Sequence, residues 1–168
     1  MNEQKWYVVK TSSRAEKKVA ERIEKQNIKV YLPLIQSIRQ WSDRKKKISL
    51  PLIPATIFVN CHEEDLFKLY NIQGFNSILH FLKKPAIVKN YEIENLKILL
   101  KESIDEIENN ATKIFNGDKV EVIRGPLQGL IATSVEESRT HRLIVEIESL
   151  DQRFIVHVPK SFVRKLKQ

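Results

Sequence analysis

The sequence of 168 residues predicts an α+β fold in two domains. Residues 5–101 follow the order β-α-β-β-α-β-β-α, which is typical of helices packed on a mainly antiparallel sheet. Residues 102–116 are rich in acidic residues and Asn and lose the apolar stripe of the preceding helix, so we expect a linker there. Residues 117–168 contain short strand patterns separated by turn signals, which predicts a small β-barrel.

The first domain is expected to begin with a buried strand and a cationic helix. Trp6, Tyr7, Val8 and Val9 form an apolar run rich in β-forming residues. Ser13 and Glu16 have the spacing of a capping box, which predicts a helix from about residue 13 to about Asn27. Its apolar face repeats every four residues and its other face is basic, with Arg14, Lys18, Arg22 and Lys25.

The middle of this domain alternates strands with basic and acidic segments. Residues 28–38 predict a strand interrupted by Pro33, and residues 41–47 predict a basic loop or hairpin tip. Residues 50–54 are not expected to form regular strand, because two prolines remove backbone donors. Residues 57–61 predict a further strand.

The remainder of the domain predicts two helices and two short strands. Residues 62–65 place acidic side chains at a helix start, where the helix dipole favours them. Residues 77–81 and 85–88 predict short strands. Asn90 is expected to cap a third helix, whose apolar stripe is Ile93, Leu96, Leu100, Ile104 and Ile107.

The second domain is organised around residues 117–129. Val120 and Val122 alternate with charged residues, which is the pattern of a half-buried strand. Turns are predicted on both sides of that strand, and a sharp bend follows it; the residues responsible are Gly117 and Asp118, Gly125 and Pro126, and Gly129. Strands are expected at 120–123, 130–135, 143–147 and 154–158, with Val163 closing the barrel. Any β-hairpin with a tight turn is the alternative explanation of this stretch.

The charge is unevenly distributed. The net charge is +8, and residues 5–47 hold 13 Lys and Arg against 4 Asp and Glu. A basic face of this kind indicates a polyanion such as nucleic acid, although anionic lipid is an alternative. One cysteine excludes an internal disulfide and fits a reducing compartment. Without a long apolar run or a secretion signal, we expect a cytoplasmic protein with no membrane contact.

Five motifs in order resemble the bacterial NusG family. They are Trp6-Tyr7-Val8-Val9, Pro54 before Ile57-Phe58-Val59, Gly74-Phe75-Asn76-Ser77-Ile78, Pro85-Ala86-Ile87-Val88, and the stretch 117–129. The last resembles the KOW motif of SH3-like barrels. The resemblance covers nearly all of residues 5–166 and implies a NusG amino-terminal (NGN) domain at 5–101, a linker at 102–116 and a KOW domain at 117–168. Within the family, the chain resembles the specialised paralogues RfaH and the UpxY group.

The resemblance implies a monomeric, non-enzymatic transcription factor. The amino-terminal domain would bind the clamp helices of the largest RNA polymerase subunit and the non-template DNA strand, making pausing and termination rarer. The KOW domain would recruit a small-subunit ribosomal protein or a termination factor. Specialised members act on long operons for surface polysaccharides, which is therefore the expected target.

Carried over residue by residue, the polymerase-facing surface would be lined by Leu52, Ile53, Pro54, Thr56 and Ile78. The chain departs from the family here, because Ala55 and Thr56 stand where Gly and an aromatic residue are usual. It also has Ile78 at a position that is often aromatic. A place in the core is the alternative for Ile78.

The resemblance also implies a DNA-facing surface next to the first strand. Its residues would be Lys10, Ser12, Ser13, Arg22, Lys25 and Gln26, with Arg14 and Lys18 adding charge. The loop Arg44, Lys45, Lys46 and Lys47 would contact upstream DNA. The alternatives are a solvated helix face and a hairpin tip kept soluble by its charge. In the KOW domain, Leu150 at a hairpin tip is the candidate partner contact, and a singly exposed leucine is the alternative.

The sequence gives little support to the hypothesis that this protein is an enzyme. Cys61 and His62 are adjacent on a strand, so their side chains point to opposite faces and cannot form a nucleophile–base pair. We expect no catalytic residue, no metal site and no cofactor. The main competing function is a KOW-type RNA-binding or ribosome-associated protein. A membrane-surface module ranks last, because the helix at 13–27 lacks a large apolar face.

The β-branched content of residues 119–158 favours a permanent β-barrel. The alternative is refolding of this domain into helices, as in RfaH.

Overall fold

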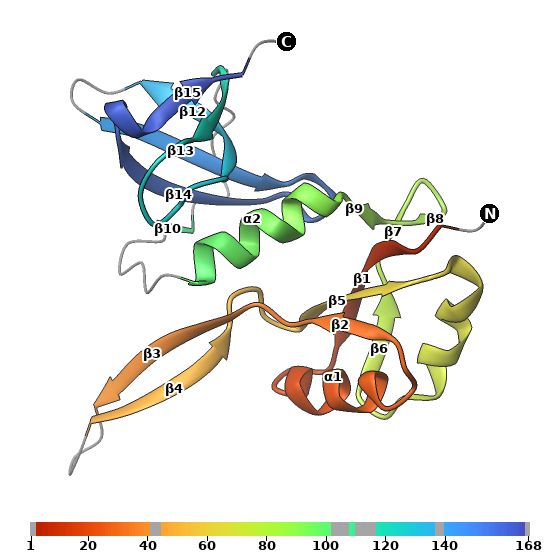
Figure 1. Ribbon diagram of the computed structural model, residues 1–168. Helices are drawn as coiled ribbons and strands as arrows, with labels where there is room; N and C mark the ends of the chain where they lie inside the picture. Colours follow the sequence, from red (N-terminus) through yellow and green to blue (C-terminus); the bar gives the residue numbers. More distant parts are fainter. Residues whose placement is uncertain (1–2, 41–44, 102–107, 110–116, 137–139, 167–168) are drawn as a thin grey trace. The chain divides into compact units, whose positions relative to one another are not determined.

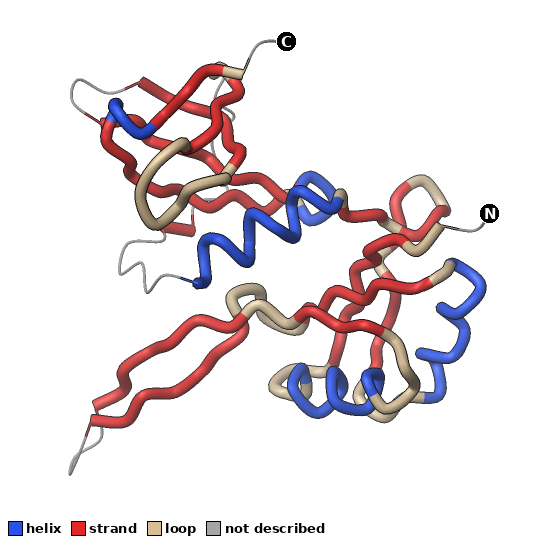
Figure 2. The backbone as a smooth tube through the Cα atoms, in the orientation of Figure 1, coloured by secondary structure: helices blue, strands red, loops and turns tan. Residues whose placement is uncertain are grey.

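The computed structural model describes residues 3–40, 45–101, 108–109, 117–136 and 140–166. The chain forms two compact units, Met1–Lys89 and Asn90–Gln168. Figure 1 names the elements of each unit, and Figure 2 follows the backbone through them. Within the described ranges, no helix is long and apolar enough to cross a membrane.

The first unit combines one α-helix, one 3₁₀ helix and nine strands, all of them within the described residues. In chain order they are β1 (Lys5–Thr11), α1 (Glu16–Glu24), β2 (Lys29–Tyr31), β3 (Leu34–Gln40), β4 (Lys45–Pro51), β5 (Thr56–Cys61), the 3₁₀ helix η1 (Glu63–Asn71), β6 (Phe75–Ile78), β7 (His80–Phe81), β8 (Lys84–Pro85) and β9 (Ile87–Val88).

The main sheet of this unit is antiparallel and has the order β2-β5-β1-β6. The strand β9 also pairs with β1, so two short strands share one edge of β1. β6 holds one end, where Val9 is opposite Ile78, and β9 holds the other, where Trp6 is opposite Val88. The α+β class predicted for this part of the chain is confirmed.

One core cluster holds the two helices against this sheet. It takes side chains from β1, α1, β5, η1 and β6, and its fully buried members are Tyr7, Val9, Val19, Ile23, Ile57, Val59 and Leu69. The burial pattern of α1 has the helical period: Glu16, Val19, Ala20 and Ile23 are buried, and the residues between them are exposed except Arg22, which is half-buried.

The predicted capping box of this helix is wrong. The helix begins at Glu16 after Ala15, and no side chain caps its first turn. Arg14 has a φ of 62°, so the backbone before the helix lies in the left-handed region, and Ser13 is not the cap residue. Glu16 uses its carboxylate elsewhere, as described below.

Three further expectations are corrected in this unit. The helix predicted after residue 62 is a 3₁₀ helix, η1. Leu50 and Pro51 belong to β4, opposite Ile35 and Leu34, because β3 and β4 form a separate two-stranded hairpin in which a proline is tolerated at the strand end. A second hairpin, β7–β8, takes up the end of the strand predicted at 77–81 and the start of the one predicted at 85–88, so that β6 and β9 are shorter than expected.

The second unit contains one α-helix and a six-stranded antiparallel sheet in the residues described. Its elements are α2 (Asn90–Lys101), β10 (Glu108–Asn109), β11 (Lys119–Val122), β12 (Ile131–Glu136), β13 (Thr140–Ile147), the 3₁₀ helix η2 (Glu148–Leu150), β14 (Gln152–Pro159), the 3₁₀ helix η3 (Lys160–Phe162) and β15 (Val163–Lys165). The sheet order is β10-β14-β13-β12-β11-β15. The strands predicted here are confirmed, and Val163 pairs with Val122 as the closing strand. The SH3-like type of this sheet remains a prediction.

The helix α2 is attached to the sheet of the second unit by an asparagine. The Asn95 side chain is buried; its Nδ2 donates to the Ile131 carbonyl (2.7 Å), and its Oδ1 accepts from the Ile131 N–H (3.1 Å). The helix α2 belongs to the second unit. The predicted domain limits of 5–101, 102–116 and 117–168 remain a prediction, and most of the expected linker lies outside the described residues.

Candidate functional site

The turn between β4 and β5 is fixed by contacts from two other elements. Ala55 has a φ of 52°, which is unusual for a residue with a side chain. Its N–H donates to Glu16 Oε1 of α1 (2.8 Å), and its carbonyl accepts from the Thr11 N–H of β1 (3.0 Å). Glu16 is 5% exposed, so this carboxylate works inside the fold. The turn is therefore held in one conformation.

Four of the residues predicted to face polymerase, Leu52, Ile53, Pro54 and Thr56, lie in or beside this turn, whereas Ile78 lies on β6, on the other side of β1. Leu52, Ile53, Thr56 and Ile78 are buried, whereas Pro54 is exposed. Ile78 belongs to the core cluster and pairs with Val9, which agrees with the alternative that it is a core residue.

Lys10 and Thr56 link the two predicted surfaces. They are opposite each other on β1 and β5, and Lys10 Nζ donates to Thr56 Oγ1 (2.9 Å). Thr56 in turn donates to the Pro54 carbonyl (3.0 Å). Burial lowers the pKa of the Lys10 ammonium below its usual value. Lys10, predicted to contact DNA, is thus hydrogen-bonded to Thr56, predicted to contact polymerase, and Thr56 continues the hydrogen bonds to Pro54.

The cations of α1 lie mostly in solvent. Ser12, Ser13, Arg14, Lys18, Lys25 and Gln26 are all exposed. Arg22 is half-buried, and its guanidinium donates to the Gln73 carbonyl. The neighbouring Lys17, which the sequence did not single out, donates to the Ser49 carbonyl of β4 (3.0 Å). The helix therefore presents a basic face while two of its cations connect it to the rest of the unit.

The basic hairpin is only partly described. Lys45 and Lys46 lie in β4 opposite Gln40 and Arg39, and Lys47 is exposed. Arg44 lies outside the described residues.

Sequence reasoning missed an exposed apolar tip. In the β7–β8 hairpin, Phe81 is 71% exposed and Leu82 is 80% exposed, and Lys83 follows them. Leu82 and Lys83 both have positive φ, at 49° and 65°. Turns with positive φ at both central residues usually contain Asn or Gly. Because this turn has Leu and Lys instead, the sequence did not predict it.

In the second unit, two glycines of the predicted motif are required by close contacts. A Cβ at Gly117 would lie 1.8 Å from the Ser134 carbonyl oxygen, and one at Gly125, whose φ is 84°, would lie 2.8 Å from the Phe162 ring. Val120 and Val122 are buried as predicted, while Asp118 forms an ion pair with Lys165 and Pro126 is exposed. Gly129 N–H donates to the Val122 carbonyl (2.8 Å).

The described residues offer little to hold a metal or to act as a nucleophile. No group of three or more potential metal-ligating side chains occurs among them. Cys61 is buried in the core cluster, and burial raises the pKa of its thiol to about 11. Its reactive thiolate is therefore scarce at neutral pH.

The comparison with protein families decides the relationship. A family model described as transcription termination factor nusG matches residues 4–97. This chain belongs to the NusG family. It is a transcription termination/antitermination factor of that family.

Two curated relatives carry the name transcription termination/antitermination protein NusG. The NusG of Rickettsia conorii is 27% identical over 87% of this chain and 82% of its own length. The NusG of Rickettsia felis is 27% identical over 98% of this chain and 91% of its own length. A solved structure titled "Domain interaction in Thermotoga maritima NusG" matches with a TM-score of 0.50, 25% identity and 98% coverage of both chains.

The turn at Ala55 gives a physical meaning to the departure from the NusG pattern. Glycine adopts positive φ without strain, so the glycine usual at this position suits the backbone seen here. In this chain alanine adopts the positive φ. The hydrogen bonds from Glu16 and Thr11 hold it there.

The candidate partner contact of the second unit is only partly accessible. Leu150 ends η2 and is half-buried, next to Asp151, whose φ is 50°. Its role in partner binding stays a prediction.

Proposed function

We propose that this NusG-family protein is an antitermination and elongation factor that travels with RNA polymerase. Its first unit binds the clamp helices of the largest polymerase subunit and touches the non-template DNA strand, so that pausing and termination become rarer. The observation that carries the proposal is the family match, which runs through the first unit from residue 4 and into α2 at residue 97. A place among the specialised paralogues, serving a long polysaccharide operon, is part of the proposal.

The polymerase contact centres on the turn that follows β4. Pro54 is the exposed member of the proposed set, and Leu52, Ile53, Thr56 and Ile78 are buried. A rigid apolar turn suits a helical partner, because a preformed surface loses little conformational entropy on binding.

The DNA contact uses the basic face of α1. Lys18 and Lys25 are exposed on it, and Arg22 keeps guanidinium donors beyond the one bound to Gln73. Ser12 and Ser13 are exposed just before the helix. Phosphates dominate such a contact, so it should weaken as salt rises. Lys45, Lys46 and Lys47 extend the charge along β4.

Replacing Arg22 and Lys25 by Ala should weaken binding to single-stranded DNA. It should also flatten the salt dependence by up to about two phosphate contacts. The measurement is fluorescence anisotropy of a labelled oligonucleotide at several salt concentrations. As a matched control, replacing Lys83 and Lys84 by Ala removes the same charge from another element of the same unit and should leave the slope unchanged. An unaltered slope in the Arg22 and Lys25 variant would contradict the assignment.

The function itself is tested by run-on transcription across a terminator, with and without the purified protein. We expect more read-through and shorter pauses when the protein is present. Unchanged read-through, combined with binding of ribosomal RNA by residues 117–168, would instead support the RNA-binding alternative.

The proposed role of the second unit is to recruit a partner protein. We place a small-subunit ribosomal protein or a termination factor at this unit, with Leu150 as its contact. Leu150 is half-buried at the end of η2, so a partner would meet part of its side chain.

A further inference from the structure

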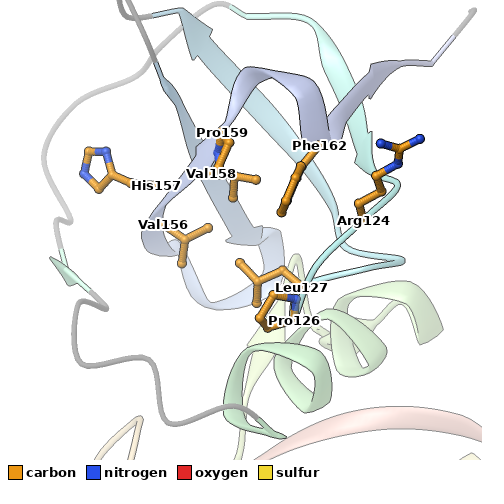
Figure 3. Close-up of a pocket in the computed structure, with 8 residues that line it drawn as sticks. All are labelled: Arg124, Pro126, Leu127, Val156, His157, Val158, Pro159 and Phe162. Atoms are coloured by element: carbon orange, nitrogen blue, oxygen red, sulfur yellow. The ribbon is translucent and has the colours of Figure 1, made fainter.

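The two units offer candidate sites of opposite chemistry. Figure 3 shows an apolar pocket of the second unit, into which the side chains of Leu127, Val156, Val158 and Phe162 point; it belongs to the recruitment already proposed for that unit. The first unit instead has a chain of hydrogen bonds between its two proposed surfaces. This chain runs from Lys10 on β1 through Thr56 on β5 to the Pro54 carbonyl.

The middle member of this chain, Thr56, does not touch a partner directly. It is fully buried, with 0% of its surface exposed, whereas Pro54 is exposed. The NusG pattern usually has an aromatic residue at this position, and an aromatic side chain offers a large apolar surface to a partner. A buried threonine offers none. Any effect of Thr56 on binding must therefore pass through the groups that it contacts.

The register of the sheet brings Thr56 and Lys10 together. The two residues are opposite each other on β5 and β1, and opposite residues of antiparallel strands point to the same face. Val9 and Ile57, their neighbours along the two strands, belong to the core cluster. Because successive side chains of a strand alternate between faces, Lys10 and Thr56 lie on the face away from that cluster.

The hydroxyl of Thr56 is oriented by its two partners. A hydroxyl has a single proton to donate, and Thr56 donates it to the Pro54 carbonyl (3.0 Å). Its oxygen is then an acceptor, and Lys10 Nζ donates to it (2.9 Å). The turn below is fixed as well, because Ala55 is hydrogen-bonded to both α1 and β1. The lysine ammonium is therefore held from a rigid base.

Lys10 keeps the capacity to bind an anion in this arrangement. An ammonium group has three donors, and Thr56 accepts from one of them. Within the part of the chain that the structure describes, no carboxylate forms an ion pair with Lys10, so its charge is available. A lysine stem is flexible, and an ammonium that is already held in place loses less conformational entropy when a phosphate binds.

We propose that Thr56 is a positioning residue for DNA binding: its hydroxyl holds the Lys10 ammonium in place for a phosphate of the non-template strand. The position that is usually aromatic in the family thereby serves the DNA contact in this chain, not the polymerase contact. This inference rests on the proposed function, and in particular on the DNA contact at Lys10.

The test is fluorescence anisotropy of a labelled single-stranded oligonucleotide with the full chain at several salt concentrations. Thr56→Val keeps the shape of the side chain and removes the hydroxyl, so binding should weaken about threefold. The salt dependence should stay the same, because Lys10 remains charged. Lys10→Met should weaken binding further and flatten the salt dependence by about one phosphate contact. Thr56→Ser, which keeps the hydroxyl, should bind like the parent chain.

A double-mutant cycle separates positioning from a general loss of structure. In the Lys10→Met chain, Thr56→Val should have no further effect, because the ammonium that Thr56 positions is gone. In a Lys17→Met chain, Thr56→Val should keep its full effect. Lys17 is the matched control, because its ammonium is also held by a hydrogen bond but to a different acceptor, the Ser49 carbonyl (3.0 Å).

The outcomes distinguish this inference from the proposed function. If Lys10→Met changes neither affinity nor salt dependence, the DNA contact at Lys10 is wrong and the role of Thr56 is wrong with it. If Lys10→Met acts but Thr56→Val does not, or if Thr56→Val acts equally in the Lys10→Met chain, only the role of Thr56 is overturned. Weaker binding of a clamp-helix fragment by the Thr56→Val chain, with unchanged DNA binding, would also overturn it and assign Thr56 to the polymerase surface.

Discussion

At the scale of single residues, Glu16 shows how a local pattern can mislead. Its spacing from Ser13 is that of a capping box, yet its carboxylate accepts from the N–H of Ala55, 39 positions away. The spacing of neighbouring residues cannot predict a hydrogen bond between residues this far apart in the sequence. The apolar periodicity of α1 was correct because it depends on the helix alone, whereas the partner of Glu16 depends on the tertiary fold.

Glu16→Ala should destabilise the first unit by about 1–3 kcal/mol, because the Ala55 N–H then loses its acceptor in a partly buried turn. Urea unfolding followed by tryptophan fluorescence measures this, since Trp6 is buried in β1. Glu24→Ala on the exposed face of the same helix is the control and should change stability by no more than about 0.5 kcal/mol. Equal effects of the two substitutions would show that the carboxylate does not hold the turn.

Cys61 should be slow to alkylate in the folded chain. Burial raises the pKa of its thiol from 9.0 to about 11. The thiolate fraction at mildly alkaline pH should fall by about 100-fold relative to the unfolded chain, and the rate with iodoacetamide should fall at least as far. Similar rates with and without concentrated urea would contradict the burial.

The same shift fixes the sign of a pH effect. Below pH 9 the thiol is protonated in both states, so its contribution to stability is fully present. Between pH 9 and 11 the unfolded chain releases a proton that the folded chain keeps, and stability falls as the pH rises.

At the scale of elements, the main lesson concerns α2. Its apolar stripe predicted a helix, and the helix is present from Asn90 to Lys101; Ile104 and Ile107 of that stripe lie outside the described residues. The stripe did not indicate which sheet it meets. Among the described contacts, Asn95 joins α2 to the sheet of the second unit, because its side-chain amide both donates to and accepts from the main chain of Ile131. A buried asparagine in an apolar stripe was the available signal.

Asn95→Ala should speed hydrogen exchange at the Ile131 amide by about tenfold or more, because that N–H loses its acceptor. Amide exchange of the intact chain measures it residue by residue. Glu94→Ala on the solvent side, where Glu94 pairs with Lys97, is the control and should leave the Ile131 rate unchanged. Unaltered exchange in the Asn95→Ala chain would mean that another contact protects this amide.

At the scale of the whole molecule, the sequence predicted the order of elements better than their contacts. Alternation and turn residues located β1, β5 and the strands of the second unit, because those signals are local. The β3–β4 strands were obscured by Pro51, and the β7–β8 turn by its lack of Gly or Asn. The candidate site residues Lys10 and Thr56 were both named from the family resemblance, but their hydrogen bond follows only from the register of β1 and β5.

The helical content of the intact chain provides a further check. The two α-helices of the described residues have nine and twelve residues, and the described part of 117–166 is built of strands and 3₁₀ turns. Far-ultraviolet circular dichroism of the intact chain should therefore show a modest helical signal, matching these helices. A large helical excess that is absent from isolated residues 117–168 would show that the second unit refolds, as in RfaH.

The shared edge of β1 has a consequence for how this protein can vary. Because β6 and β9 are anchored on the same strand, the eight residues between them form an excursion that returns to its starting point, closed by the Ala86 N–H bound to the Leu79 carbonyl (2.8 Å). Lengthening that excursion at Lys83 would leave both anchors in register. A reporter peptide inserted there should therefore leave the sheet of the first unit intact, and the same segment can vary in length without loss of the fold.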